Sequence, residues 1–239
     1  MTGHREYKIV LLPGLDGTGR LFSPLLSCVD DPSSLLVVRY QDLPADLDQL
    51  TEQAEAMIPE GQAVILIAES FSSLVALRLL ERGKLQIAGI LFFAGFARAP
   101  CPLLLNLARF VPATLIKIFS TNPLLVRLFF LTNKMPLSVF DLYLDVVRGL
   151  PSEVLKDRIR LLHGAKNLPS IRTDIPFGQL RIRGDLLVSK RSTTDLRTLN
   201  PALFIWEVDG THFFLQTNPE KSLQIIREFC QSATGSTPV

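Results

Sequence analysis

Short apolar runs recur along the chain and alternate with longer segments in which apolar residues return at helical spacing. The runs are rich in valine, isoleucine, leucine and phenylalanine, as expected for strands covered on both faces of a parallel sheet. Six runs predict strands, at Tyr7–Leu12, Leu35–Arg39, Ala63–Ala68, Ile87–Phe93, Gln179–Arg183 and Leu203–Val208. The longer segments predict helices at Leu47–Met57, Phe71–Arg82 and Glu220–Cys230. This alternation predicts an α/β fold with a mostly parallel sheet.

The alternation stops between residues 97 and 176, where the pattern predicts helices alone. Six prolines divide this stretch into short pieces: Pro100, Pro102, Pro112, Pro123, Pro136 and Pro151. Because proline ends or kinks helices, we expect several short helices here and no strand. The sequence therefore predicts a core at residues 1–96 and 177–239, with residues 97–176 as a helical lid over one edge of the sheet.

Composition and charge narrow the class of protein. The chain has 239 residues, 47% of them hydrophobic, and its 25 basic residues nearly balance 23 acidic ones. This length suits one domain with an insertion, and the charge balance argues against nucleic acid as a partner. The cysteines Cys28, Cys101 and Cys230 lack metal-site or disulfide spacing, which favours buried or half-buried thiols in a reducing compartment. We find no secretory signal and no run of about 18 apolar residues, so we expect a cytoplasmic protein.

One serine occupies the corner between the third predicted strand and the helix after it. The strand ends at Ala68, Ser70 stands at the turn, and the helix begins near Phe71. Such a corner exposes a hydroxyl at the sheet edge beside backbone N–H groups of the helix N-terminus, as acyl-transfer chemistry requires. Next to it, Glu69 is expected to be a solvated carboxylate at the helix N-terminus, with a role in substrate selection as the alternative. A plain helix-capping serine gives the same pattern, and Ser72 stands where a glycine is usual, so the corner alone leaves both interpretations open.

A glycine-rich turn, Pro13-Gly14-Leu15-Asp16-Gly17, follows the first predicted strand. A turn at this place can offer the backbone N–H of Leu15 to a developing oxyanion, opposite the N–H of Phe71. We expect Gly14 and Asp16 to border the substrate in the same turn. A phosphate-binding loop is the alternative, but no Lys-Ser or Lys-Thr pair follows, and the glycines lack dinucleotide-binding spacing.

Asp185 and His212 each follow a later predicted strand, as Ser70 follows the third. Because the carboxyl ends of parallel strands meet at one edge of a sheet, we expect the three side chains to lie close together. Their order along the chain is typical of a nucleophile, an orienting acid and a base. Asp209 competes for the role of the acid, but it lies too near His212 in sequence to reach the back of the imidazole ring.

The chain resembles the α/β-hydrolase family over nearly its whole length. Four segments carry the resemblance: Pro13-Gly14-Leu15-Asp16-Gly17, Glu69-Ser70-Phe71-Ser72, Gly184-Asp185-Leu186-Leu187-Val188 and Gly210-Thr211-His212. The Glu-Ser-Phe corner is similar to that of small bacterial esterase-like hydrolases and of plant plastid esterase/acyltransferases. The size and the helical lid resemble carboxylesterases of the pimeloyl-carrier-protein methyl esterase type. The chain departs from the family where Ala68 and Ser72 replace glycines and where Pro13 replaces a histidine.

The resemblance implies a minimal sheet of about six parallel strands, because the chain begins at the family's third strand. It also implies nucleophilic acyl transfer with Ser70 as nucleophile, His212 as base and Asp185 as orienting acid, without a metal or cofactor. The expected substrate is a carboxylic ester or thioester with an apolar acyl group, as a small molecule or bound to a carrier. An acyltransferase with an alcohol acceptor and a non-catalytic scaffold are the alternatives.

Between residues 98 and 134 the chain combines apolar residues with cations and has no acidic residue. The charged residues are Arg98, Arg109, Lys117, Arg127 and Lys134. One interpretation is a lid whose apolar side packs on the core and whose basic residues are solvated. The others are a lid that lines an acyl-chain pocket, and peripheral contact of the basic face with a membrane surface or an acyl-carrier protein.

Overall fold

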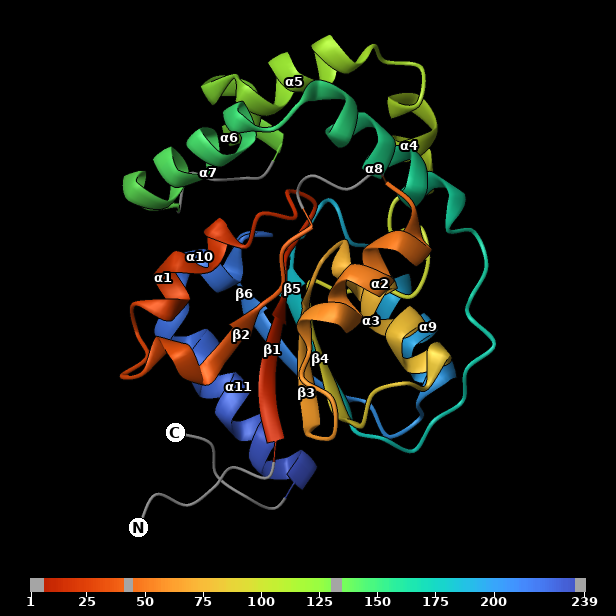
Figure 1. The fold of residues 1–239 in the computed structure, drawn as a ribbon. Coiled ribbons are helices and arrows are strands. Elements are labelled where there is room, and N and C mark those ends of the chain that lie inside the picture. The colour runs from red at the N-terminus through yellow and green to blue at the C-terminus, as the bar shows by residue number, and fades with distance from the viewer. Residues whose placement is uncertain (1–6, 41–44, 130–134, 235–239) are drawn as a thin grey trace.

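A computed structural model describes residues 7–40, 45–129 and 135–234, and it has a central sheet flanked by helices (Figure 1). All neighbouring strands are parallel, and their order across the sheet is β2-β1-β3-β4-β5-β6. The strands are β1 (Tyr7–Leu12), β2 (Leu35–Val37), β3 (Ala63–Glu69), β4 (Ile87–Phe93), β5 (Phe177–Arg183) and β6 (Phe204–Asp209). The expected α/β fold with a parallel sheet of six strands is confirmed.

Helices cover both faces of the sheet, and alternate residues of each strand pack against one face or the other (Figure 1). In β1, Val10 and Leu12 belong to one buried cluster, whereas Ile9 and Leu11 belong to the other. The first cluster includes residues of α2 (Leu47–Met57), α3 (Ser72–Arg82) and α9 (Arg191–Leu199). The second includes residues of α1 (Ser23–Leu26), α10 (Phe214–Thr217) and α11 (Pro219–Thr234), and short 3₁₀ turns at Arg20–Phe22 and Pro32–Ser34 flank α1.

The edges of the sheet differ from the sequence-based expectation. We predicted a strand as far as Arg39, but β2 ends at Val37. The amide of Val38 still donates to the carbonyl of Leu11 on β1 at 3.0 Å, and the amide of Tyr40 then donates to the carbonyl of Gly17 in the turn at 2.9 Å. We also expected every strand to be covered on both faces. None of the residues of the last strand, β6, is fully buried, and Phe204 on it is exposed.

Among the described residues, five helices lie between β4 and β5 in the chain, and they stack above the carboxyl ends of the strands (Figure 1). We call them the cap: α4 (Pro102–Ala108), α5 (Ala113–Thr121), α6 (Pro123–Phe129), α7 (Leu137–Gly149) and α8 (Ser152–Gly164). They have their own buried cluster, which also takes in Leu21 and Phe213 from the core. At the start of the cap segment, Arg98 donates two hydrogen bonds of 2.7 Å to buried Asp195 on α9. The cap is therefore packed onto the sheet edge where the candidate residues lie.

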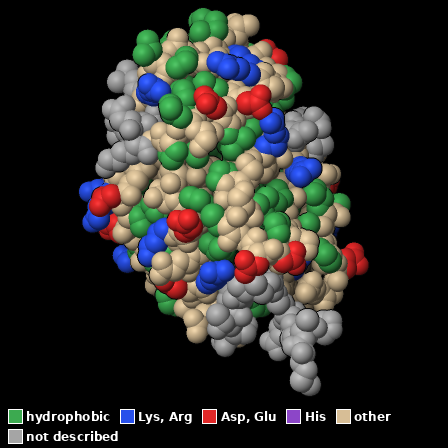
Figure 2. Space-filling view, turned by 90° about the vertical axis from the view of Figure 1, so that its left-hand side faces the viewer, with side chains coloured by type: hydrophobic (Ala, Val, Ile, Leu, Met, Phe, Trp, Pro, Cys, Tyr) green, Lys and Arg blue, Asp and Glu red, His purple; other side chains and the backbone are tan. Residues whose placement is uncertain are grey.

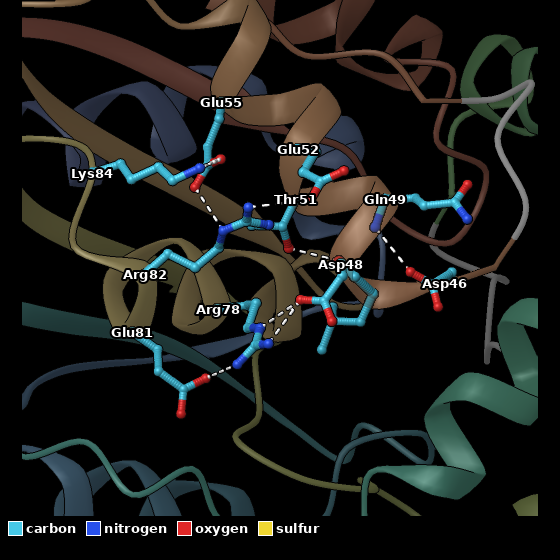
Figure 3. Close-up of polar contacts among 11 residues, drawn as sticks. Asp46, Asp48, Gln49, Thr51, Glu52, Glu55, Arg78, Glu81, Arg82 and Lys84 are labelled. Carbon is cyan, nitrogen blue, oxygen red and sulfur yellow. Dashed lines mark hydrogen bonds and ion pairs between the residues drawn. The ribbon is translucent and has the colours of Figure 1, made fainter.

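Ion pairs join α2 and α3 on the surface (Figure 3). Arg78 of α3 pairs with Asp48 at 2.8 Å and with Glu81, and Arg82 pairs with Glu55 at 3.1 Å. Surface pairs of this kind each contribute about 1 kcal/mol or less. The buried apolar side of α3 therefore does more than these charges to fix the helix that follows Ser70.

Candidate active site

Ser70 lies at the corner between β3 and α3. Its φ is 46°, in the left-handed region, and its amide donates to the carbonyl of Phe93 on β4 at 2.9 Å. A residue with a Cβ persists in this region only where its surroundings hold it there. Phe71, and not Ser70, occupies the N-cap position of α3, one residue before the helix. The corner thus presents the Ser70 hydroxyl to the cavity beneath the cap.

Ser70, His212 and Asp185 form one chain of hydrogen bonds. The Ser70 Oγ lies 3.0 Å from His212 Nε2, and His212 Nδ1 lies 2.8 Å from Asp185 Oδ2. The other oxygen of Asp185 accepts hydrogen bonds from the amides of Leu187 at 2.8 Å and Val188 at 3.2 Å. Both carboxylate oxygens are therefore engaged, which fixes the side chain behind the imidazole ring.

Asp209 faces away from this chain of hydrogen bonds. It lies at the end of β6, and its two oxygens accept hydrogen bonds of 2.8 and 2.7 Å from Arg183 on the surface. The structure therefore brings Asp185, and not Asp209, against His212.

The electrostatic surroundings strengthen the pairing of His212 with Asp185. Burial would lower the pKa of His212, but the charge and hydrogen bond of Asp185, with the charge of Glu69, raise it above the ordinary 6.5. Burial would raise the pKa of Asp185, but the charge and hydrogen bond of His212 and the amides of Leu187 and Val188 lower it overall. The site thus holds an ionised carboxylate behind an imidazole that is more basic than a free histidine.

The turn after β1 borders the same cavity as Ser70, through Gly14, Leu15 and Asp16. The amide of Gly17 donates to the carbonyl of Gly14 at 3.1 Å and closes the turn. The buried carboxylate of Asp16 accepts hydrogen bonds from the Thr18 amide at 2.8 Å and from the Thr18 hydroxyl at 2.5 Å. Asp16 therefore shapes the turn from inside, in addition to bordering the cavity.

The carbonyl of Pro13 ties this turn to the serine corner. The hydroxyls of Ser72 and Tyr40 both contact it, Tyr40 at 3.0 Å, and they also contact each other. Burial raises the pKa of Tyr40 well above its ordinary value, so the phenol stays neutral. The hydroxyl of Ser72 therefore contacts the Pro13 carbonyl, a contact that a glycine at this position could not make. Tyr40 was missed in the sequence, although it follows a predicted strand as Ser70 does.

Arg158 of α8 holds the turn from the cap side, and the sequence pattern does not single it out. It is fully buried, and its guanidinium donates to the carbonyls of Leu15 and Tyr40, each at 2.7 Å. A Cβ on Gly17 would lie 2.5 Å from the same guanidinium, so only glycine leaves room for it here. Arg158 therefore positions the backbone on either side of this turn and links it to the cap.

Glu69 is buried, contrary to the expectation of a solvated carboxylate. Gln216 of α10 donates to its Oε1 at 2.8 Å. Its Oε2 has no hydrogen-bond partner of ordinary geometry among the described residues, although the Gly14 amide lies near enough to favour the charged form. Burial dominates and raises the pKa of Glu69 from 4.5 to about 7. The expectation was wrong because the side chain turns beneath the glycine-rich turn and α10 instead of toward water.

A cavity of about 250 Å³ opens at Ser70, between the sheet edge and the cap. Tyr143 of α7 borders it and packs edge-on against Phe213, with ring centroids 5.1 Å apart. Much of the remaining wall consists of apolar cap residues: Leu104, Leu105, Ala108, Val147, Leu155, Ile159 and Leu162. The hydrogen-bonded chain of Ser70, His212 and Asp185 therefore meets a mainly apolar space.

Across residues 7–40, 45–129 and 135–234, no group of three or more His, Cys, Asp or Glu side chains is arranged to hold a metal ion. Within the same residues, none of the helices has the length and apolar character needed to cross a membrane. Cys28 and Cys101 are half-buried and Cys230 is buried, as expected.

Solved structures are similar to this chain over nearly its whole length, whereas no model of a known protein family and no curated protein matches its sequence. MenH from S. aureus has a TM-score of 0.75 at 13% identity, with 97% of this chain and 96% of that chain covered. A bromoperoxidase from Bacillus anthracis has a TM-score of 0.74 at 14% identity, with 94% and 92% covered. The RedJ thioesterase of the prodiginine pathway in Streptomyces coelicolor has a TM-score of 0.65 at 16% identity, with 95% and 90% covered.

These neighbours are α/β-hydrolases, and their likeness at such low identity concerns the fold and not the substrate. It agrees with the parallel six-stranded sheet flanked by helices. The chain therefore has the α/β-hydrolase fold.

Proposed function

We propose that this protein is a serine hydrolase that cleaves a carboxylic ester or thioester with an apolar acyl group. One observation carries the proposal. The hydrogen bonds of 3.0 and 2.8 Å that link Ser70 to His212 and His212 to Asp185 begin at a hydroxyl that borders an apolar cavity. A nucleophile, a base and an orienting acid in this geometry are what acyl transfer requires.

In the proposed reaction the Ser70 oxygen attacks the substrate carbonyl while His212 Nε2 accepts the hydroxyl proton. The tetrahedral intermediate then expels the alcohol or thiol, which takes the proton from His212, and the acyl group stays on Ser70 as an ester. Water attacks this ester, again giving a proton to His212, and the acid leaves as Ser70 regains its proton. Asp185 holds the ring and stabilises its charged form, a role that suits the lowered pKa of this carboxyl.

We assign the oxyanion site to the backbone amides of Leu15 and Phe71. Leu15 belongs to the turn after β1, and Phe71 precedes the first residue of α3, so both border the cavity beside Ser70. Each such donor is worth about 3 kcal/mol of transition-state stabilisation in comparable enzymes. Gly14 and Asp16 would border the substrate in the same turn, with Asp16 acting through its bonds to Thr18.

The apolar wall of the cavity supports an acyl chain as the part of the substrate that is bound there. Thioesterases occur among the structural neighbours, including RedJ and the type II thioesterase BorB from the borrelidin biosynthetic cluster. Their names support small-molecule or carrier-bound acyl substrates as the class to test first.

The test is hydrolysis of p-nitrophenyl acyl esters of increasing chain length by the wild type and by Ser70→Ala. We expect the wild type to release p-nitrophenol and Ser70→Ala to lose at least about a thousandfold in kcat/KM. Ser120→Ala is the matched control, because Ser120 also borders the cavity but has no hydrogen bond to His212 among the described residues. Activity of Ser70→Ala equal to that of the wild type would refute the proposal.

A further inference from the structure

The outer side of α4, α5 and α6 is an unusually apolar surface. Fourteen residues are exposed between positions 102 and 127, and four of these are polar or charged, namely Asn106, Arg109, Thr114 and Arg127. The other ten are Pro102, Leu103, Leu107, Phe110, Pro112, Leu115, Ile118, Phe119, Pro123 and Leu124. We call these fourteen residues the outer cap surface. Leu103 and Leu124 are 80% and 77% exposed, a much larger exposed fraction than that of a core residue that is only partly covered.

The opposite sides of these helices are already packed. Leu105, Ala113, Ile116 and Val126 are buried, and Ile116 and Val126 belong to the buried cluster that includes α7. In Figure 1, α5 lies at the end of the cap farthest from the sheet, whereas α4 lies beside α8, and in Figure 2 that end of the molecule carries hydrophobic side chains together with charged ones. A contiguous exposed apolar patch on a folded protein usually marks an interaction site.

The charges of the outer cap surface indicate the chemistry of its partner. Arg109 and Arg127 are its only charged residues, and no acidic residue occurs from position 98 to 134. Within the described residues neither arginine forms an ion pair, and their guanidinium groups lie 4.4 Å and 5.1 Å from the ring centroids of Phe110 and Phe140. Arginines beside exposed apolar side chains suit a lipid surface, where the cations meet anionic headgroups and the apolar groups enter the acyl region.

Two other basic residues of this segment are engaged within the protein, and the third, Lys134, lies outside the described residues. Arg98 pairs with Asp195, and Lys117 donates to the carbonyls of Arg148 and Leu150. An acyl-carrier protein, which would be recognised by a cluster of cations, therefore finds only two available cations among ten apolar residues. A lipid leaflet fits this composition better, because it needs no dense pattern of charge.

Helix α4 joins the outer cap surface to the candidate active site. Leu103 and Leu107 lie on its exposed side, while Leu104, Leu105 and Ala108 border the cavity that reaches Ser70. The width of one helix therefore separates a surface suited to lipid from a space suited to an acyl chain.

We propose that the outer cap surface docks on an anionic lipid leaflet and that the substrate is an ester or thioester resident in that leaflet, which enters the cavity past α4. The docking stands on the surface alone, whereas the entry of substrate rests on the proposed hydrolase function.

The experiment is flotation of the full chain with vesicles of phosphatidylcholine alone or mixed with phosphatidylglycerol, at low ionic strength. We expect binding that is stronger to the anionic vesicles and at least about tenfold weaker in Leu103→Gln/Leu107→Gln. Arg109→Gln/Arg127→Gln should bring binding to anionic vesicles close to that on phosphatidylcholine. The matched control, Leu137→Gln/Phe204→Gln, removes two exposed hydrophobic side chains outside the outer cap surface and should bind as the wild type does.

Hydrolysis of a short soluble p-nitrophenyl ester without vesicles is measured on the same preparations, and the α4 variant should keep it. Wild-type protein that cleaves this ester but does not float with either vesicle would overturn the docking and leave the hydrolase function standing. Wild-type protein that floats with anionic vesicles but cleaves no ester would support the docking and refute the entry of an ester substrate past α4. The docking would also be overturned if the control pair lost as much vesicle binding as the α4 variant. The same holds if the wild type formed a dimer instead of binding vesicles and only the α4 variant abolished that dimer.

Discussion

Two aspartates near His212 are held in opposite ways. Asp185 accepts hydrogen bonds from the imidazole and from two amides, whereas Asp209 pairs with Arg183 on the surface. We expect Asp185→Asn to lower kcat on a chromogenic ester by roughly a thousandfold or more, because the amide favours the wrong tautomer of the ring. Asp209→Asn should stay within about twofold of the wild type, since it removes only an exposed ion pair. Loss of activity in Asp209→Asn alone would reverse the assignment.

The buried carboxyl of Glu69 should make folding stability depend on pH. Its pKa is raised to about 7 in the folded protein from 4.5, so between these values the folded state binds one more proton than the unfolded state. The unfolding free energy therefore falls as pH rises through this window, by about 3 kcal/mol from this group. Glu69→Gln removes that contribution, so its stability relative to the wild type should rise between pH 5 and pH 8.

Urea denaturation of both proteins at several pH values measures this difference. Glu60→Gln is the control, because Glu60 is exposed and water solvates its carboxylate in both states. A difference between Glu69→Gln and wild type that stays constant from pH 5 to pH 8 would contradict the buried, proton-binding carboxyl.

The position of a single residue was predictable from the sequence where the topology of the sheet alone determines it. Ser70, Asp185 and His212 each follow a strand, and parallel strands bring such positions to one edge. Glu69 was misjudged because its burial depends on Gln216, 147 residues away in sequence. A carboxylate at a helix start looks the same in sequence whether it faces water or another element.

At the scale of elements, α8 reaches from the cap to the turn after β1 through Arg158. We expect Arg158→Met to destabilise the protein by about 2–4 kcal/mol, because it leaves the buried carbonyls of Leu15 and Tyr40 without their donor. It should also lower kcat on a short soluble ester by about tenfold, since the Leu15 amide loses its fixed position.

Arg160→Met on the same helix is the matched control for this prediction. Arg160 is exposed and pairs with Asp157, so its loss should change the unfolding free energy by less than about 1 kcal/mol and leave kcat unchanged. Wild-type kcat in folded Arg158→Met would show that this arginine supports the fold and not the turn.

The elements themselves were largely predictable, because strands and helices depend on local periodicity. The predicted bounds differ at β2, which ends at Val37 instead of Arg39, at β5, which begins at Phe177 instead of Gln179, and at α11, which continues to Thr234 instead of Cys230. The two contacts of Arg158 span 143 and 118 residues of sequence, so no local pattern could have indicated them.

At the scale of the whole molecule, the cavity exists only where the cap meets the sheet edge. Ala108→Phe should fill part of it, because Ala108 of α4 borders the cavity. We expect kcat/KM on a decanoyl ester to fall at least about tenfold while activity on an acetyl ester changes little. Asn106→Phe adds the same ring to the exposed side of α4 and is the control. An equal loss on both esters would place the acyl chain elsewhere.

The sequence predicted helices across residues 97–176 and an apolar, basic character from residue 98 to 134, but not which side of each helix faces the cavity. That assignment depends on how α4, α7 and α8 pack on one another, which the prolines that separate the helices do not specify. The apolar residues of the cap therefore divide into a cavity wall and an exposed surface only once the helices are assembled.

The central claim is that Ser70 is a nucleophile activated by His212. Its most direct test is incubation of the full chain with a fluorophosphonate probe, followed by peptide mapping of the adduct. We predict one covalent adduct, on Ser70, that is absent from Ser70→Ala and formed much more slowly in His212→Ala. The absence of any adduct in wild-type protein, or an adduct that persists unchanged in Ser70→Ala, would contradict the account.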